Sequence, residues 1–435
     1  MPSYSGVWTL TAVYQAVGAG NWTNPSYWIA TLSGSGYDYG QGIAVDSSGN
    51  VYVAGIITGN NFLLTKYNKF GAIQWQRKLG TCNDKGFGNI LAIDSAGNSY
   101  VVGTITEASL NLILFKYDTS GTLQWQKKLT GASSENGYGV AVDSSGNVYV
   151  CGSTDSQGAG SNDALIVKYN SSGTVQWQRR LGGTGNDIAY SVAVDSSANV
   201  YIVGIAGTGG FGGSDVLVAK YNTSGTIQWQ RRLGGATQDN GKSTAVVDSS
   251  GNIYLSADTN SSGAGSYDTL IAKYDTSGTL QWQRTFGSAG TDINFGIAVD
   301  SSGSAYVTGQ SSSSLFIVKY DTSGTIQWQR SLSSSGDEAG YAIAVDSVGV
   351  MYVTGYTTVS DPSSEYDVLI VKLPADGSLT GTYGSFTYAV TTLTSATSSL
   401  SDATATLTEA AATLTEGTPT LTPSTPTLTS TVTRI

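Results

Sequence analysis

Short apolar segments that alternate with polar residues recur along most of the chain. In the stretch 137–183 four of them stand between clusters of Gly, Ser, Asn and Asp, and they span Val140–Val142, Asn147–Cys151, Ala164–Tyr169 and Thr174–Leu181. Alternation with a period of two, bounded by turn residues, is typical of half-buried β-strands and excludes an amphipathic helix. The pattern therefore predicts a unit of four strands joined by tight turns.

The sequence DSSGNVYV joins the first two strands of this unit. It stands intact at 46–53 and 143–150, and altered copies begin at Asp94, Asp195, Asp248, Asp300 and Asp346. Its glycine suits the positive φ of a tight turn, and its aspartate suits the turn's own amides as an acceptor. Seven copies of the motif predict seven hairpins and therefore seven repeats.

A second motif, QWQ, marks the fourth strand of the unit. Its tryptophans are Trp75, Trp125, Trp177, Trp229, Trp282 and Trp328, which stand roughly 50 residues apart. Four-stranded units of that length, repeated side by side, are typical of a β-propeller. The predicted fold class is all-β: a seven-bladed propeller with four-stranded blades.

The seventh unit lacks a tryptophan where one is due, in VLIVKLPADGSLTGTYGS. Upstream, SYWIATLSG aligns Trp28 and Leu32 with Trp75 and Leu79 of QWQRKLG. We therefore predict that a strand at 26–32 completes the seventh blade and closes the ring, with Trp28 as its buried anchor. Closure would cover edge strands that otherwise pair with other chains.

The chain divides into three predicted regions: an N-terminal docking arm (1–25), the propeller (26–376) and a C-terminal stalk (377–435). In the last region one apolar residue recurs every seven positions, at Leu393, Leu400, Leu407, Leu414, Leu421, Leu428 and Ile435. A single apolar stripe cannot bury itself in a monomer, and the prolines beyond residue 417 exclude a continuous helix. We predict a self-associating stalk, with a trimer favoured; the alternative is a Thr/Pro-rich linker.

Composition narrows the chemistry. The chain of 435 residues has a formal net charge of -10, which excludes a basic surface for nucleic acid. It has no histidine, and its two cysteines, Cys82 and Cys151, lack metal-ligand spacing. We therefore predict no catalytic residue and no cofactor. No apolar run is long enough to cross a membrane, and the first basic residue is Lys66, so we expect neither membrane insertion nor a cleaved signal peptide.

One acidic residue stands just before the first strand of each unit. The set is Asp38, Asp84, Glu135, Asp187, Asp239, Asp292 and Asp337. In a closed ring these carboxylates would form a circle near one channel mouth, a place suited to a hard cation or a polar ligand. The alternative is that each one caps a turn by accepting backbone hydrogen bonds. The residues alone leave both interpretations open.

Lysines also follow the repeat, near the end of each third strand. They are Lys66, Lys116, Lys168, Lys220, Lys273, Lys319 and Lys372. One interpretation is a grip on an anionic glycan; the other is that they neutralise acidic neighbours and cover tryptophan faces.

The segments AVDSSGNVYVCG, DALIVKYNSSGTVQW and LGG together resemble the seven-bladed β-propeller repeat of bacterial and phage surface proteins, over residues 26–375. The uncharged segment SGVWTLTAVYQAVGAGNW (5–22) is similar to opening segments of structural proteins of marine tailed phages. Its apolar surface also suits a docking element; the alternative is an extra strand that folds back on the propeller.

The resemblance implies a non-enzymatic virion structural protein, such as a tail fibre, spike or decoration protein. The arm would contact other virion proteins, and the propeller would be displayed on the virion surface or tail, where a cell-surface glycan is a candidate partner. The alternatives are a bacterial surface adhesin or carbohydrate-binding lectin outside the cell, and then a polysaccharide-degrading enzyme.

Overall fold

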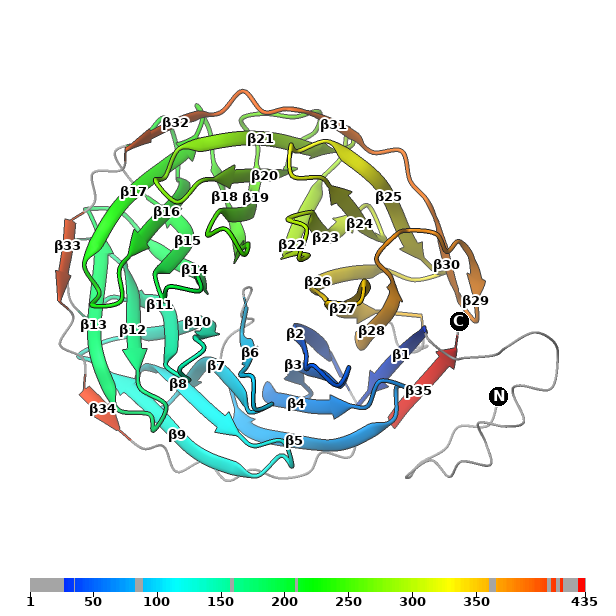
Figure 1. The fold of residues 1–435 in the computed structure, drawn as a ribbon, viewed down its shortest axis with the longest axis horizontal. Helices are drawn as coiled ribbons and strands as arrows, with labels where there is room; N and C mark the ends of the chain where they lie inside the picture. The colour runs from blue at the N-terminus through cyan, green and yellow to red at the C-terminus, as the bar shows by residue number, and fades with distance from the viewer. Residues whose placement is uncertain are drawn as a thin grey trace.

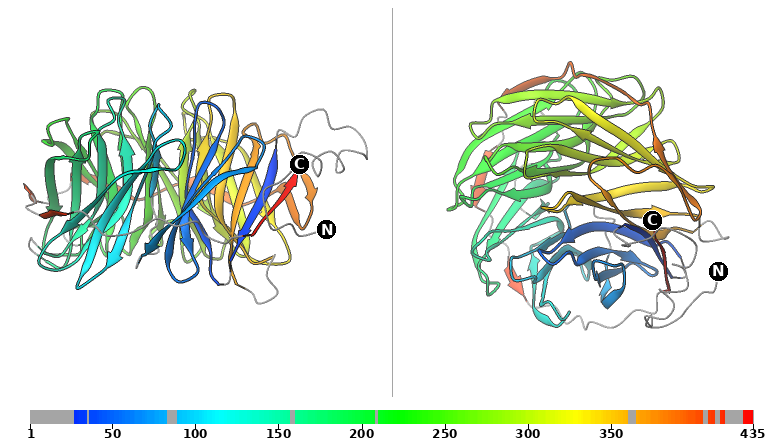
Figure 2. Two further views of the ribbon diagram at one scale, coloured as in Figure 1. Left: turned by 90° about the horizontal axis from the view of Figure 1, so that it is seen from below. Right: turned by 45° about the vertical axis from the view of Figure 1, so that its right-hand side comes forward.

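The computed structural model describes residues 27–34, 36–82, 89–156, 160–207, 210–359, 365–404, 408–411, 415–417 and 429–434. Over these residues the chain forms seven antiparallel sheets arranged radially around a central axis (Figure 1). Seen from the side, the ring is a flat disc (Figure 2). This confirms the predicted all-β, seven-bladed propeller with four-stranded blades. The described part of the chain contains no helix long and apolar enough to cross a membrane.

Each blade runs from an inner strand at the channel to an outer strand at the rim. The first, innermost strands are β2 (Tyr39–Val45), β6 (Leu91–Ile93), β10 (Glu135–Val142), β14 (Ile188–Val194), β18 (Asp239–Val247), β22 (Asp292–Val299) and β26 (Glu338–Val345). The second strands are β3 (Val51–Ile57), β7 (Ser99–Thr106), β11 (Val148–Thr154), β15 (Val200–Ala206), β19 (Ile253–Thr259), β23 (Ala305–Ser311) and β27 (Val350–Thr357).

The outer half of each blade holds the Lys and Trp motifs. The third strands are β4 (Asn61–Tyr67), β8 (Leu110–Tyr117), β12 (Asp163–Tyr169), β16 (Asp215–Tyr221), β20 (Asp268–Tyr274), β24 (Ser314–Tyr320) and β28 (Asp367–Pro374). The fourth strands are β5 (Ile73–Thr81), β9 (Leu123–Thr130), β13 (Val175–Gly182), β17 (Ile227–Gly234), β21 (Leu280–Gly287), β25 (Ile326–Ser333) and, in the seventh blade, β1 (Trp28–Ser33). We number the blades 1 to 7 from β2 to β26.

The second and third strands are buried on both sides because a neighbouring blade covers each face. Strand β11, for example, is buried along its whole length. Its Tyr149 joins one hydrophobic cluster with Leu217 of blade 4. The core therefore lies between the blades and is divided into repeated wedges. This is why the same aromatic and aliphatic residues return in each unit.

The seventh blade combines strands from distant parts of the sequence. Strand β1 pairs antiparallel with β28, from Trp28 opposite Lys372 to Leu32 opposite Val368. Trp28 is fully buried, and its indole nitrogen donates a 3.3 Å hydrogen bond to the carbonyl of Lys69 in blade 1. The N-terminal arm predicted at 1–25 lies outside the described residues.

The C-terminal region differs from the predicted stalk. Its strands lie along the rim of the ring, each as a fifth strand on a blade (Figure 1). They are β30 (Phe386–Val390) beside β25, β31 (Thr394–Thr397) beside β21, β32 (Ser401–Thr404) beside β17, β33 (Thr408–Ala411) beside β13, β34 (Thr415–Gly417) beside β9 and β35 (Thr429–Arg434) beside β1. A further strand, β29 (Gly381–Tyr383), pairs with β30. We call β30 to β35 the strap.

The heptad period of this region is the step from one blade to the next. Equivalent pairs are Arg330 with Val390, Arg284 with Thr397, Arg231 with Thr404 and Arg179 with Ala411. Seven extended residues span about 23 Å, so each repeat supplies one short strand and one connection. The two described members of the apolar stripe face this chain's own blades: Leu400 is 6% exposed, and the partly buried Leu393 packs against the core. The residues Leu407, Leu414, Leu421, Leu428 and Ile435 lie outside the described part.

Candidate functional site

The two faces of the ring are built differently. One face carries the turns between first and second strands and between third and fourth strands. In the first kind of turn, Asp46 Oδ1 accepts hydrogen bonds of 2.9 Å from the amides of Ser48 and Asn50, and Gly49 has a φ of 79°. The same arrangement returns in the other blades, so the aspartate of this motif accepts hydrogen bonds within its own turn.

The opposite face carries the connections between second and third strands and the crossings from blade to blade. These second-to-third connections differ in length, from two residues at 312–313 to nine at 358–366. We call this side the variable-loop face. Loops that vary on a constant scaffold are the usual place for binding residues, so the search for a site begins here.

Asp38 and Asp187, two acidic residues of the predicted ring, lie on this face and point into their own loops. Asp38 accepts hydrogen bonds from the amides of Gly34 (2.6 Å) and Thr58 (2.8 Å). Asp187 accepts from Gly183 (2.8 Å) and Gly207 (3.0 Å). These two carboxylates thus tie the crossing before their blade to the loop after the second strand. The described geometry favours the turn-capping interpretation over a shared cation site.

The seventh member of the set is displaced by one residue. Asp337 is exposed, whereas Glu338 is fully buried and accepts hydrogen bonds from Ser334 and Thr357. Burial raises the pKa of Glu338, as it does for Asp38 and Glu135. Asp84 lies outside the described residues. Among the described residues no group of three or more acidic or cysteine side chains is placed to hold a metal ion.

Asn89 of blade 2 reaches across the central channel. Its side-chain nitrogen lies 3.4 Å from the carbonyl of Ala245, which belongs to a blade across the ring. The carbonyl of Asn89 accepts a hydrogen bond of 2.8 Å from the amide of Val140. These two contacts join blade 2 to its neighbour, blade 3, and to blade 5 across the channel.

Five tyrosines meet at the channel mouth on the variable-loop face, between blades 7 and 1. We call Tyr37, Tyr39, Tyr341, Tyr356 and Tyr366 the tyrosine cluster. Ring centroids are 5.1 Å apart for Tyr37 and Tyr366, 5.2 Å for Tyr39 and Tyr366, and 4.3 Å for Tyr356 and Tyr366. Tyr341 stacks on Tyr39 at 6.1 Å and meets Phe295 of blade 6 edge-on at 4.5 Å.

The cluster has a buried base and an exposed edge. Tyr356 is 7% exposed and accepts a 3.0 Å hydrogen bond from the Gln310 amide, whereas Tyr37 is 57% exposed. Burial raises the pKa of Tyr356 to about 12 and also raises the pKa of Tyr39 and Tyr341. These three phenols are therefore neutral hydrogen-bond donors throughout the physiological pH range.

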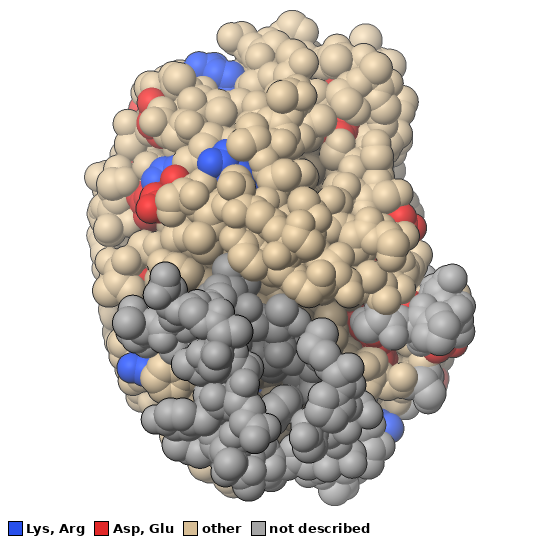
Figure 3. Space-filling view, turned by 90° about the vertical axis from the view of Figure 1, so that its right-hand side faces the viewer, with Lys and Arg blue, Asp and Glu red and all other residues tan. Residues whose placement is uncertain are grey.

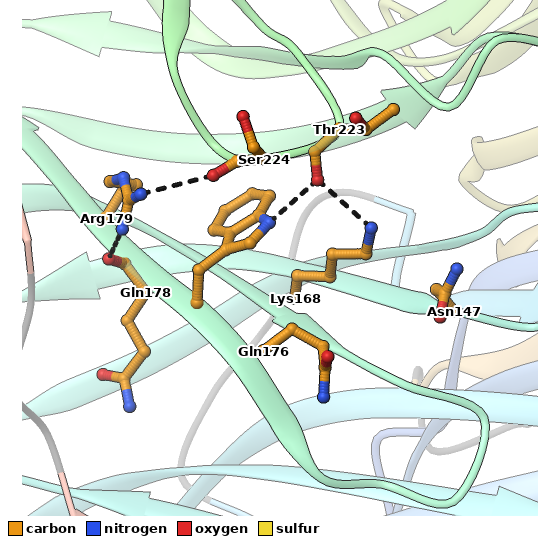
Figure 4. Close-up of a pocket in the computed structure, with 8 residues that line it drawn as sticks. Asn147, Lys168, Gln176, Gln178, Arg179, Thr223 and Ser224 are labelled. Carbon is orange, nitrogen blue, oxygen red and sulfur yellow. Dashed lines mark hydrogen bonds between the residues drawn. The ribbon is translucent and has the colours of Figure 1, made fainter.

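The repeated basic residues serve contacts between blades. In the junction of blades 3 and 4, Lys168 Nζ (3.2 Å) and Trp177 Nε1 (3.1 Å) both donate to the carbonyl of Thr223 (Figure 4). Arg179 donates to the carbonyl of Gly225 at 2.7 Å and lies over the Trp177 ring. At the junction of blades 5 and 6 the corresponding residues line a groove. Because these donors are engaged by the adjacent turn, they favour a structural role over a grip on a glycan.

Sequence reasoning missed the tyrosine cluster. Its members come from both ends of the propeller sequence, at 37–39 and 341–366, and only the closed ring makes them neighbours. The available signal was that Tyr37 and Tyr39 have no aromatic counterparts at the start of the third unit, where Ser134 and Asn136 stand.

Comparison with known proteins agrees with this architecture. Residues 28–62, 124–158, 176–207 and 281–317 match the Beta-propeller repeat family, and residues 144–175 match a beta-propeller domain of unknown function. The chain is also similar to the crystal structure of a puromycin hydrolase mutant complexed with PGG, at 14% identity and a TM-score of 0.46, over 74% of this chain and 50% of that one. At that level the similarity carries no conclusion about activity.

Among curated proteins, the chain is 28% identical over 181 residues to the Regulatory protein FlaEY of Caulobacter vibrioides. The match covers 35% of this chain and 19% of that protein, so the chain spans a small part of its relative. The strand order and the family matches together identify the chain as a β-propeller repeat protein.

Proposed function

We propose that this propeller is a non-enzymatic binding head that contacts a carbohydrate through the tyrosine cluster. The observation that carries the proposal is the convergence of five tyrosines at the one point where the two ends of the ring sequence meet. The cluster departs from the sevenfold repeat. A feature that served only to build the blades would be expected to recur in each of them.

The chemistry of the cluster suits a sugar. Tyrosine offers a large rigid ring at low entropic cost, together with a polar tip. Pyranose rings present apolar C–H faces that pack on such rings, and hydroxyl groups that pair with neutral phenols. The described part of the rim in Figure 3 carries only scattered charges.

The buried carboxylates support a binding role rather than hydrolysis. A glycosidase needs two carboxyl groups that flank an open substrate position. Asp38 and Glu338 border the tyrosine cluster, yet both are fully buried and accept hydrogen bonds from their own loops. They are thus committed to holding the loops that present the tyrosines.

We place this head on a virion surface or tail, with a bacterial cell surface as the alternative. The support is the resemblance of the repeat and of residues 5–22 to surface and phage structural proteins. Immunogold labelling of purified particles and of intact cells would separate the two locations. Self-association through the C-terminal leucines stays a prediction; Leu400 is already buried against its own chain, and light scattering on the full chain would measure the mass.

The binding proposal is tested with a glycan array followed by titration calorimetry on the strongest hit. Tyr37→Ala removes the most exposed ring of the cluster and is expected to abolish binding without changing the melting temperature. Phe211→Ala is the matched control, because Phe211 is 39% exposed on the same face in blade 4. Equal affinity of the wild type and Tyr37→Ala for every bound glycan would refute the proposal.

A further inference from the structure

A buried aspartate begins the third strand of several blades, and in two of them an arginine neutralises it. In blade 3, Arg180 Nη1 donates to Asp163 Oδ2 at 2.8 Å. In blade 4, Arg232 Nη1 lies 3.5 Å from Asp215 Oδ2. Both arginines stand on the fourth strand, opposite the third residue of the third strand. A buried carboxylate and a nearby guanidinium are the expected combination in a low-dielectric interior.

Blade 5 keeps the aspartate and lacks the arginine. The position opposite Leu270 is Thr285, where the two preceding blades have Arg180 and Arg232. Asp268 itself is placed as in those blades: a methyl group on Gly287 would overlap its Oδ1, as one on Gly234 would overlap Oδ1 of Asp215. The carboxylate is therefore retained in position without its cation.

A second carboxylate adjoins Asp268. The same methyl group on Gly287 would lie 3.0 Å from Oδ2 of Asp292, the acidic residue that begins β22 of blade 6. Asp268 is 1% exposed and Asp292 is fully buried. The loops over the pair are joined by a 2.8 Å hydrogen bond between the hydroxyls of Ser266 and Thr291. Two carboxylates thus share one closed position.

Each carboxylate keeps one oxygen without a hydrogen-bond partner in the described part of the chain. Oδ2 of Asp268 accepts from the Gly265 amide (2.9 Å), and Oδ2 of Asp292 accepts from the amide and hydroxyl of Ser288 (2.6 and 2.7 Å). Oδ1 of both residues is buried and unpaired, and so is Oδ1 of Asp163 and of Asp215 in the blades that have an arginine. In Asp187, by contrast, the amide of Gly207 satisfies Oδ1; blade 6 has only the short 312–313 connection there.

We propose that the Asp268–Asp292 pair binds a calcium ion, which supplies the positive charge that a guanidinium supplies in blades 3 and 4. Two buried carboxylates with free oxygens would otherwise leave charge uncompensated, and native proteins fill such places with a partner. Calcium prefers carboxylate, hydroxyl and carbonyl oxygens. Ser288 Oγ, beside Asp292, is a neutral oxygen at the same place. The ion would join blades 5 and 6 and is independent of carbohydrate binding.

The test uses the full chain, stripped with a chelator and titrated with calcium chloride. The wild type is expected to bind one ion per chain by calorimetry and to melt at a higher temperature with calcium. Asp268→Asn and Thr285→Arg should both lose the ion and the shift; Thr285→Arg also restores the charge balance of blades 3 and 4, so it should stay folded. Asp163→Asn, at a site with its own arginine, is the control that should keep the response.

Two results would overturn the proposal. One is a wild type that binds no calcium at millimolar concentration and whose melting temperature does not respond to it. The other is calcium binding that persists unchanged in both Asp268→Asn and Thr285→Arg, because the ion would then be held elsewhere on the chain.

Discussion

The strap makes a specific prediction about Leu400. This side chain is 6% exposed and shares a hydrophobic cluster with Leu233 and Leu270 of blades 4 and 5. The carbonyl of Leu400 also accepts a 2.8 Å hydrogen bond from the Gln283 side chain. Truncation of a buried leucine to alanine costs about 2–5 kcal/mol. The strap can separate locally from the rim, so we expect the lower value, about 2 kcal/mol, for Leu400→Ala.

This loss of stability should appear as more frequent local opening of the strap. A loss of about 2 kcal/mol corresponds to roughly 30-fold faster exchange of the protected amides, and hydrogen exchange read by mass spectrometry resolves the peptides that contain β31 and β32. The melting temperature of so large a ring should change little. Val390→Ala is the matched control: it lies on the same strap but is 63% exposed, and its effect should stay within about 0.5 kcal/mol.

The reasoning fails if the wild-type amides of β31 and β32 exchange as fast as those of an unstructured peptide. It also fails if Leu400→Ala leaves their exchange unchanged. Either result would mean that these strands do not rest on the blades, and the heptads would then be interpreted as the self-associating stalk or as the Thr/Pro-rich linker.

Three further predictions address the ring itself. Ala198 has a φ of 59° in the turn where other blades have glycine, so Ala198→Gly should raise the free energy of unfolding by about 1 kcal/mol; in the intact turn of blade 3, Gly146→Ala should lower it. Trp28→Ala should destabilise the ring by about 3–5 kcal/mol in denaturant titration. Burial raises the pKa of Glu338, so its stabilising contribution is present at low pH and is lost as pH rises through that pKa; relative to Glu338→Gln, the wild type should gain stability between pH 7 and pH 4.

The blades could be predicted from the sequence because each repeat contains the residues that determine its own turns and strands. Asp46 and Gly49 form a turn through local hydrogen bonds and backbone conformation, so the motif predicts a turn wherever it occurs in the sequence. Trp177 predicts the fourth strand because a large ring fills the space between two adjacent blades at this position of each repeat. Such features depend on neighbours in sequence or on the identical adjacent unit, and they are visible in one chain.

The strap and the tyrosine cluster depend on contacts that a single sequence does not display. A seven-residue apolar period is shared by coiled coils and by an extended chain that crosses one blade every seven residues, and Leu400 fits both. The assignment of Asp337 instead of Glu338 has a similar origin. Both are acidic, and only the pairing of Glu338 with Thr357 shows which one begins the strand.

The arrangement also narrows where a partner can bind. The strap covers the outer strands of blades 2 to 6, and β35 covers β1 in blade 7, so in these blades the described rim offers few unpaired strand edges for association. One face consists of near-identical turns whose polar groups are satisfied within the turn. The variable-loop face holds both departures from sevenfold symmetry that carry chemistry, the tyrosine cluster and the Asp268–Asp292 pair. In a ring built from equal wedges, a ligand recognises what one wedge has and the others lack, and for the described residues this difference lies on that face.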